Sequence, residues 1–298
     1  MNIEEIYQEF YKKNLLNNNA IDFIGFNVSA DVDQPFFFKT YQHIGTVIEN
    51  YDPFITLLEG KDMIKNYIPI ITSDTKRMQY DVRLDKRNND NMLEVLSCLA
   101  DYFPLLDQMA DSVLAEIYYL SKMKITALSG YDMAALYFLG LQWNGGVLSA
   151  LKTHFLTRKV NDPNHFSDGF WYDDHYFLSY FKASENKFCK KIATIVEEFL
   201  KQLEGHLWMF GIDALKNSDI KYKIYLQNQN GFDIEEILRI LNIYSEFDGV
   251  CIVLNHLIHW LLKHPELSLY GFAITVTTQE TYGLNLYFIP PLHSRENV

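Results

Sequence analysis

Cysteine is scarce in this sequence, and long apolar runs are missing. Cys98, Cys189 and Cys251 are odd in number and far apart, so they predict buried reduced thiols rather than a disulfide framework. No segment approaches the roughly 20 apolar residues of a membrane-spanning helix. Residues 1–5 lack the basic start of a secretion signal. These absences predict a cytoplasmic protein that does not interact with membranes.

Positive charge is also in short supply. Lysine and arginine total 26 against 38 aspartates and glutamates, which gives a net charge of −12. An acidic surface does not attract nucleic acid, so the balance excludes nucleic-acid binding over the whole surface. Any anion must be bound by a local cluster of basic residues. The sequence also has no P-loop, no GxGxxG and no GxSxG motif.

Aromatic residues are abundant, with 20 tyrosines and 21 phenylalanines in 298 residues. Phenylalanine fills a hydrophobic core without further requirements. Each buried tyrosine hydroxyl needs a hydrogen-bond partner, and a cavity lined with rings and polar groups supplies such partners. The composition therefore favours a ring-lined site inside a large core.

One sequence pattern occurs four times along the chain. An apolar strand that contains a glycine is followed by a return strand with a basic or amide residue and, two positions later, an aromatic residue. The copies begin at Gly25, Gly140, Gly211 and Gly271. A repeat of this kind determines the architecture before any single residue is interpreted. Each copy predicts a β-hairpin, and the turn at residues 144–146 carries the strong Asn-Gly signal.

The spacing of the glycines predicts a fifth hairpin. Gly140, Gly211 and Gly271 are separated by similar intervals, whereas Gly25 and Gly140 are separated by nearly two. In the middle of that gap two segments alternate as strands do. The predicted hairpins are Ile21–Val28 with Phe36–Gln42, Tyr67–Thr72 with Arg77–Asp85, Leu136–Trp143 with Leu148–Arg158, Leu207–Leu215 with Ile220–Gln227, and Leu269–Thr277 with Tyr282–Ile289.

Helical periodicity fills the segments between hairpins. The predicted helices cover residues 90–102, 105–123, 166–181, 185–203, 232–243 and 248–263, with Asp233 and Asp248 as N-terminal caps. No strand is followed by a single crossover helix, which excludes a doubly wound parallel sheet. We expect an α+β fold of five ααββ-like units that forms one domain over residues 1–298.

The return strands have one apolar face and one polar, aromatic face. The amphipathic helices must bury their apolar stripes, and the apolar face of the sheet can receive them. Ten strands in an open sheet would leave two unpaired edges, and closure removes these edges. We therefore predict a ten-stranded antiparallel β-barrel with an outer ring of helices. The alternative is an open sheet with lysines on a solvated face, which explains one Lys-x-Tyr pair better than four phased copies.

Several cations and rings share the predicted lumen. The cations are Lys39, Arg83, Lys152, Lys221 and Lys223, and the neighbouring rings are Tyr41, His154, Tyr225 and Tyr287. Clustered cations repel each other unless an anion lies among them, so the pattern predicts a bound polyanion such as a diphosphate. Ring faces stabilise a positive charge, which indicates a cationic or planar group nearby.

Carboxylates and amides occupy matching positions of the repeat. Asp213 is in phase with Asn27 and Gln142, Asp81 shares the predicted lumen face, and Asn285 stands where other copies have a cation. Asp213 is a candidate acid or base and equally a candidate structural partner. His256, His259 and His264 share a face only in part, so they do not predict a metal site.

The repeated ααββ units, the five hairpins and the Lys-x-Tyr return strands resemble the aromatic prenyltransferases of the PT-barrel (ABBA) fold. Residues 221–225 (Lys-Tyr-Lys-Ile-Tyr) are similar to the diphosphate-binding strand of that family. Residues 151–154 and 211–213 look most like the cyanobactin peptide prenyltransferase branch, whereas residues 270–287 are similar to the last hairpin of the small-molecule bacterial branch.

The resemblance implies transfer of a dimethylallyl or geranyl group from its diphosphate to an aromatic or other nucleophilic side chain of a cyclic peptide or amino acid. It implies that the five cations bind diphosphate, that Asp213 or Asp81 is catalytic, and that Tyr41, His154, Tyr225, Tyr287, Asn285, Gln142 and Asn27 shield the allylic cation or contact substrate. Mg²⁺ is the cofactor expected for the cyanobactin branch, and the absence of a DDxxD motif fits direct basic contacts.

Three aspects remain as alternatives or expectations. The acceptor is a peptide or a small aromatic natural product, and the protein is a monomer or a weak dimer. A non-catalytic barrel that binds an anionic or prenylated ligand is the alternative from another class. The sequence also departs from the family, because Asn27 stands near the place in the first hairpin where a carboxylate is expected.

Overall fold

A computed structural model describes most of the strands and the C-terminal half of the chain. The described residues are 3–5, 7–8, 21–29, 36–42, 64–72, 77–84, 108–109, 111–113, 115, 136–156, 178, 181–182, 186–216 and 219–289. In this part of the chain no helix is long and apolar enough to cross a membrane. The predicted helix at residues 90–102 lies outside the described residues, and those at 105–123 and 166–181 are described only at a few helical positions.

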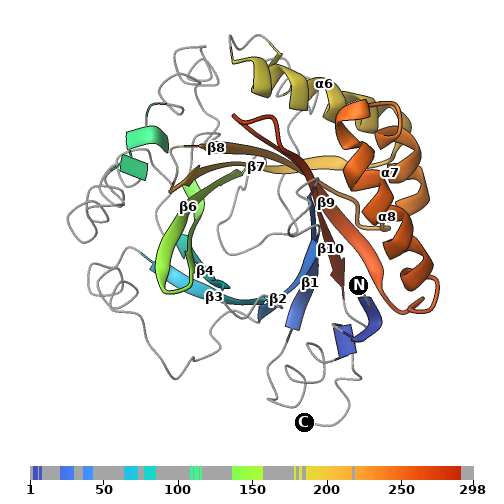
Figure 1. Cartoon of the computed structure of the whole chain (residues 1–298), viewed down its shortest axis with the longest axis horizontal. Helices are drawn as coiled ribbons and strands as arrows, with labels where there is room; N and C mark the ends of the chain where they lie inside the picture. Colours follow the sequence, from blue (N-terminus) through green and yellow to red (C-terminus); the bar gives the residue numbers. More distant parts are fainter. Residues whose placement is uncertain are drawn as a thin grey trace.

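Ten strands pair in one closed antiparallel order, in which β1 contacts both β2 and β10 (Figure 1). They are β1 (Ile21–Ser29), β2 (Phe36–Gln42), β3 (Ile64–Thr72), β4 (Arg77–Leu84), β5 (Leu136–Asn144), β6 (Val147–Leu156), β7 (His206–Leu215), β8 (Ile220–Gln227), β9 (Ser268–Thr277) and β10 (Tyr282–Ile289). Each hairpin predicted from the repeat is confirmed. β3 begins at Ile64 rather than at Tyr67, because Ile64 pairs with Leu84 ahead of a bulge.

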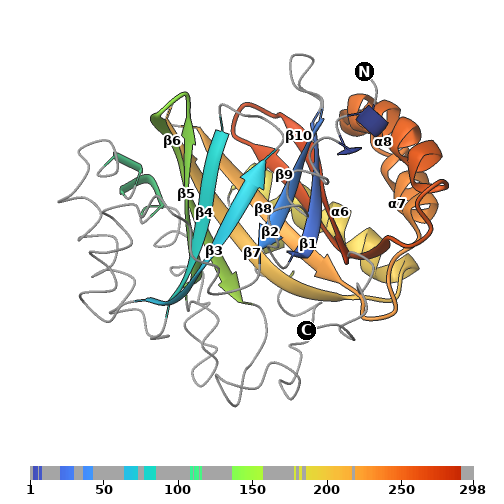
Figure 2. The same cartoon turned by 90° about the horizontal axis from the view of Figure 1, so that it is seen from below.

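Three described helices lie outside the barrel. They are α6 (Lys187–Gln202), α7 (Ile234–Leu241) and α8 (Asp248–Leu261), and a short 3₁₀ turn, η3 (Ser245–Phe247), precedes α8. α6 packs on β8 and β9, and α8 packs on β1 and β10. Figures 1 and 2 show all three on the outer side of the same half of the barrel. The apolar face of the sheet therefore faces helices, as predicted.

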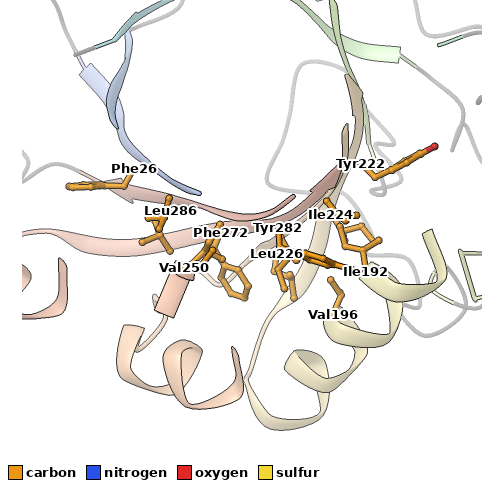
Figure 3. Close-up of a cluster of buried hydrophobic side chains, with 14 of the residues drawn as sticks. Phe26, Ile192, Val196, Tyr222, Ile224, Leu226, Val250, Phe272, Tyr282 and Leu286 are labelled. Atoms are coloured by element: carbon orange, nitrogen blue, oxygen red, sulfur yellow. The ribbon is translucent and has the colours of Figure 1, made fainter. Parts of the chain in front are cut away.

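The main core fills the layer between barrel wall and helices (Figure 3). Phe272 and Ile224 point outward from neighbouring strands and are fully buried with Ile192 and Val196 of α6. Burial of one such side chain contributes about 1.5–3 kcal/mol. Because the main core lies outside the sheet, the inner face of the barrel can carry polar and charged side chains.

Of the two predicted helix N-caps, the structure confirms one. Asp233 caps α7, since its side chain accepts from the Glu235 N–H, as predicted. The cap predicted at Asp248 is wrong: Phe247 is the N-cap of α8. The 3₁₀ turn runs directly into α8 and places Asp248 in the first helical turn, where its charge still favours the positive end of the helix.

A helical segment near the N-terminus was not predicted. Glu4 accepts hydrogen bonds from Trp260 Nε1 at 2.6 Å and interacts with His264 Nε2 at 3.0 Å. The Tyr7 ring packs on Phe38 and Trp260 with centroid distances of 5.7 and 4.7 Å. The segment thus joins the outer face of β2 to the end of α8.

Candidate active site in the barrel lumen

Strand register places the predicted cations on one inner face. Asp81, Gly140, Lys152, Asp213 and Lys221 stand opposite one another on five consecutive strands, from β4 to β8. Directly opposed residues in an antiparallel pair project from the same side of the sheet. The side opposite this row carries the core described above, so the row lies on the face that lines the lumen.

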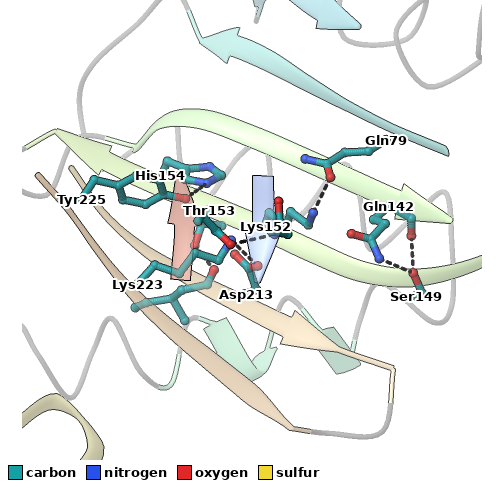
Figure 4. A network of polar contacts seen from close by, with 12 residues as sticks. Gln79, Gln142, Ser149, Lys152, Thr153, His154, Asp213, Lys223 and Tyr225 are labelled. Carbon is teal, nitrogen blue, oxygen red and sulfur yellow. Dashed lines mark hydrogen bonds and ion pairs between the residues drawn. The ribbon is translucent and has the colours of Figure 1, made fainter. Parts of the chain in front are cut away.

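Buried lysines form the centre of the candidate site (Figure 4). Lys39, Lys152 and Lys223 are only 4%, 6% and 6% exposed. Lys39 and Lys152 donate to the same oxygen, Gln79 Oε1, at 3.1 and 2.6 Å. A neutral amide oxygen thus brings two ammonium groups from strands β2 and β6 together. Gln79 was not among the predicted site residues, although the alternation of β4 places it on the lumen face.

Lys223 forms an ion pair with Asp213, which is 2% exposed. Burial raises the pKa of the Asp213 carboxyl, but the positive charges of Lys223 and Lys152 outweigh burial, so this pKa lies below its ordinary value. The carboxyl is therefore ionised at neutral pH and is a weak base. Its second oxygen, Oδ1, is buried and has no hydrogen-bond partner among the described residues.

Aromatic side chains form a second layer of the lumen. His154 Nε2 lies 3.0 Å from the Tyr225 hydroxyl, and Tyr225 faces Tyr287 with ring centroids 5.9 Å apart. Trp208 meets Tyr225 edge-on at 6.3 Å. Met209 and Ala273 pack against the two tyrosines in a cluster separate from the main core. This layer offers ring faces and apolar surface beside the lysines.

The lysine layer and the ring layer lie at different heights along the barrel axis. On each of three return strands the cation precedes the ring by two residues: Lys39 and Tyr41, Lys152 and His154, Lys223 and Tyr225. All return strands run in the same direction away from their hairpin turns, because they follow one another in an antiparallel barrel. The cation layer therefore lies nearer to the turns and the ring layer farther from them.

The recurring glycines stand in register with residues of the lumen face. Gly25 stands opposite Lys39 and Tyr287, and Gly271 stands opposite Tyr287 and Gln227. A Cβ on Gly271 would meet the Leu226 carbonyl oxygen at 2.8 Å. The orientation of these glycines follows from the repeat, since a residue in phase with lumen-facing cations must itself face the lumen.

The remaining predicted site residues are placed as follows. Asn27 donates to Asn285 at 2.7 Å across the β1–β10 closure, and Gln142 donates to the Ser149 hydroxyl at 3.3 Å. Lys221 is half-buried. The side chains of Tyr41, Asp81 and Arg83 lie outside the described residues, so only their strand positions are defined. Sequence reasoning missed Trp208 and Met209, because a bulge in β7 changes the alternation there.

The described lumen residues do not fit a metal ion bound by the protein itself. Mg²⁺ prefers carboxylate oxygens and water. The described lumen holds one carboxylate on this row, Asp213, and Lys223 already pairs with it. No group of three or more acidic, histidine or cysteine side chains suited to a metal occurs among the described residues. The expected Mg²⁺ requirement stays a prediction, in which the diphosphate itself would supply the ligands.

Comparison with known proteins identifies the fold. No family model and no curated protein matches the sequence. Among the solved structures that share the fold are AnaPT from Neosartorya fischeri, with 9% identity over 90% of this chain and 78% of that chain at a TM-score of 0.53, and the NotF prenyltransferase, with 8% identity over 89% of this chain and 79% of that chain at a TM-score of 0.56. The chain thus has the ABBA-type fold predicted from its hairpins. Identities this low show the fold alone.

Proposed function

We propose that the protein is a prenyltransferase. It transfers a dimethylallyl or geranyl group from the diphosphate to an aromatic or other nucleophilic side chain of a peptide or amino acid. The observation that carries this proposal is the layered lumen, in which buried lysines lie beside a layer of rings inside a barrel of ABBA type.

The lysine layer supports an anionic substrate. Removing an ammonium group from water costs several kcal/mol unless an opposite charge compensates it. Lys39 and Lys152 converge on one neutral oxygen, and Lys223 is balanced by Asp213. Two converging cations in a chain of net charge −12 favour a multiply charged anion. A diphosphate that bridges Lys39 and Lys152 would add a charge-assisted contact to each of them.

The ring layer supports a carbocation intermediate. When the C–O bond of an allylic diphosphate breaks, the electron pair leaves with the diphosphate and the allyl group becomes a cation. A desolvated cation–π contact contributes up to about 2 kcal/mol, and Tyr225 and Tyr287 present such faces next to the lysines. Exclusion of water by the closed wall protects the cation until the acceptor attacks.

The acceptor's proton must leave after attack. The lowered pKa of Asp213 makes this residue a poor base, so in our proposal it holds Lys223 in place and the released diphosphate takes the proton. Asp81 remains the second carboxylate candidate from the sequence. We place the acceptor near the Asn27–Asn285 pair, where the lumen carries amides instead of cations.

A mass-spectrometric assay tests the proposal. The protein is incubated with dimethylallyl or geranyl diphosphate, with Mg²⁺ or EDTA, and with aromatic amino acids, cyclic peptides or small phenols and indoles. An isoprenyl mass gain on an acceptor is the expected result, and the acceptor class decides between peptide and small-molecule substrates. Diphosphate binding without any mass gain would instead establish the non-catalytic alternative.

Lys39→Met tests the site itself, because it removes one of the two lysines between which the diphosphate is proposed to bind. It should lower turnover by about 100-fold, the typical effect of removing one group that stabilises transition-state charge. Lys190→Met removes an exposed lysine of α6 and serves as the matched control. Equal activity of the two variants would contradict the assignment of the lumen as the active site.

A further inference from the structure

His154 and Tyr225 meet across an intervening strand. His154 lies on β6 and Tyr225 on β8, with β7 between them. Neighbouring strands are about 4.8 Å apart, so these two backbones are separated by roughly 10 Å. The rings nonetheless approach edge to face, with centroids 5.6 Å apart and His154 Nε2 3.0 Å from the tyrosine hydroxyl (Figure 4).

Gly211 lies next to both rings. Gly211 stands directly opposite His154 on β6, and its other neighbour is Lys223 on β8. A Cβ built on Gly211 would lie 3.2 Å from the Thr153 carbonyl oxygen and in ordinary van der Waals contact with His154 Cδ2 at 3.4 Å and Tyr225 Cε2 at 3.5 Å. The two rings therefore enclose the space that a larger side chain at position 211 would fill.

The hydrogen bond fixes one face of the ring layer. Tyr225 also contacts Tyr287 and Trp208, and Lys223 projects from the same face of β8 two residues earlier. A phenol ring held only by packing can tilt, whereas a hydroxyl held by a neighbouring ring nitrogen fixes the ring plane. The fixed face lies beside the lysine layer, where the allylic C–O bond would break.

We propose that His154 is a positioning residue that holds the Tyr225 ring against the allylic cation and so keeps water from it. The proposal rests on the proposed prenyltransferase function. Heterolysis leaves a cation that either an acceptor or water can capture. Capture by the acceptor forms the new bond and releases the acceptor's proton, whereas capture by water forms the prenyl alcohol and releases a proton. Loss of the His154 contact should shift this partition toward water.

The experiment measures prenyl alcohol and prenylated acceptor in the same reaction. It uses dimethylallyl diphosphate with the best acceptor of the assay above, and the variants His154→Phe and Tyr225→Phe. Each should raise the ratio of alcohol to transfer product by about fivefold, the scale of one buried hydrogen bond, with little change in KM for the diphosphate. The double variant should be no worse than either single variant, because both remove the same contact.

Two further variants make the test specific. His154→Gln keeps a polar group that can reach the tyrosine hydroxyl and should restore most of the wild-type ratio. Tyr222→Phe removes a hydrogen-bonded hydroxyl from the outer face of the same strand, where Asn186 donates to it at 2.7 Å, and should leave the ratio unchanged.

The outcomes separate the two proposals. If the wild-type protein forms neither prenyl alcohol nor prenylated acceptor, the prenyltransferase proposal is wrong, and the inference about His154 is wrong with it. Wild-type turnover with an unchanged ratio in both Phe variants overturns only the inference. A raised KM at an unchanged ratio also overturns it, because His154 would then bind the diphosphate. If His154→Phe does not fold, Tyr225→Phe, which removes one oxygen, decides the question.

Discussion

At the scale of single residues, the buried lysines of the lumen differ in the groups that compensate their charge. Lys223 is buried with one carboxylate, Asp213, whereas Lys39 and Lys152 share a neutral oxygen. In our proposal the Lys223–Asp213 pair contributes to the stability of the fold, and Lys39 and Lys152 bind the substrate anion. This division predicts that variants of the two groups differ in their effects on stability and on activity.

Asp213→Asn should destabilise the fold strongly. The substitution leaves Lys223 buried without its carboxylate, which typically costs 3–5 kcal/mol. Urea unfolding followed by circular dichroism measures the loss. The double variant Asp213→Asn with Lys223→Met should recover most of the stability, because position 223 then no longer carries a buried charge without its carboxylate. An Asp213→Asn variant as stable as the wild type would show that the ion pair does not stabilise the fold.

The Asp213 contribution should depend on pH in a defined direction. The folded pKa of this carboxyl lies below its unfolded value of about 3.9, so the ionised form stabilises the fold above that value. The contribution is lost as pH falls through the folded pKa. Denaturant unfolding should therefore show a difference between wild type and Asp213→Asn that is constant near pH 7 and shrinks below about pH 4. A difference that grows on acidification would contradict this assignment.

At the scale of elements, α6 links the outer core to the site strand. Asn186 caps α6 by accepting from the Phe188 and Cys189 N–H groups, and its amide donates to Tyr222 of β8. The same strand carries Lys223 and Tyr225 on its inner face. The helix cap is thus hydrogen-bonded to the strand that holds two central lumen residues.

Asn186→Ala should lower the free energy of unfolding by about 1–2 kcal/mol, since it removes both the cap and the bond to Tyr222. Thermal unfolding of Asn186→Ser, which keeps the capping oxygen, should show a smaller loss. Lys190→Ala at an exposed position of α6 is the control and should change little. Equal stability of all three variants would show that the cap is dispensable.

At the scale of the molecule, closure joins the two ends of the chain. β1 pairs with β10 from Ile24 to Ser29, and the Asn27–Asn285 bond crosses this seam. The outer core crosses it as well, because the Phe26 ring meets Phe288 at 5.2 Å. The lumen exists only when both ends of the sheet meet.

Deleting residues 282–298 should prevent formation of the closed barrel, because β1 and β9 would each lose a partner strand. Size-exclusion chromatography with light scattering should show association, and thermal unfolding should lose its cooperative transition. A chain ending at residue 289 retains β10 and is the matched control. A monomeric, cooperatively folding protein without residues 282–298 would show that closure is not required.

The sequence by itself determined the hairpins, the two faces of each strand and the hidden fifth copy. These features are local, because alternation with a period of two and the phase of a repeat can be read along one segment. They were enough to place Lys39, Lys152, Lys223 and Tyr225 on one face.

Only the tertiary structure decided which lumen residues pair. Gln79 joins Lys39 to Lys152, Asp213 pairs with Lys223 rather than with Lys221 opposite it, and His154 reaches Tyr225 across strand β7. These contacts join residues of different strands and depend on cross-strand register, bulges and side-chain size. Alternation along a single strand carries no information about them, which is why the site's chemistry emerges only when the sheet closes.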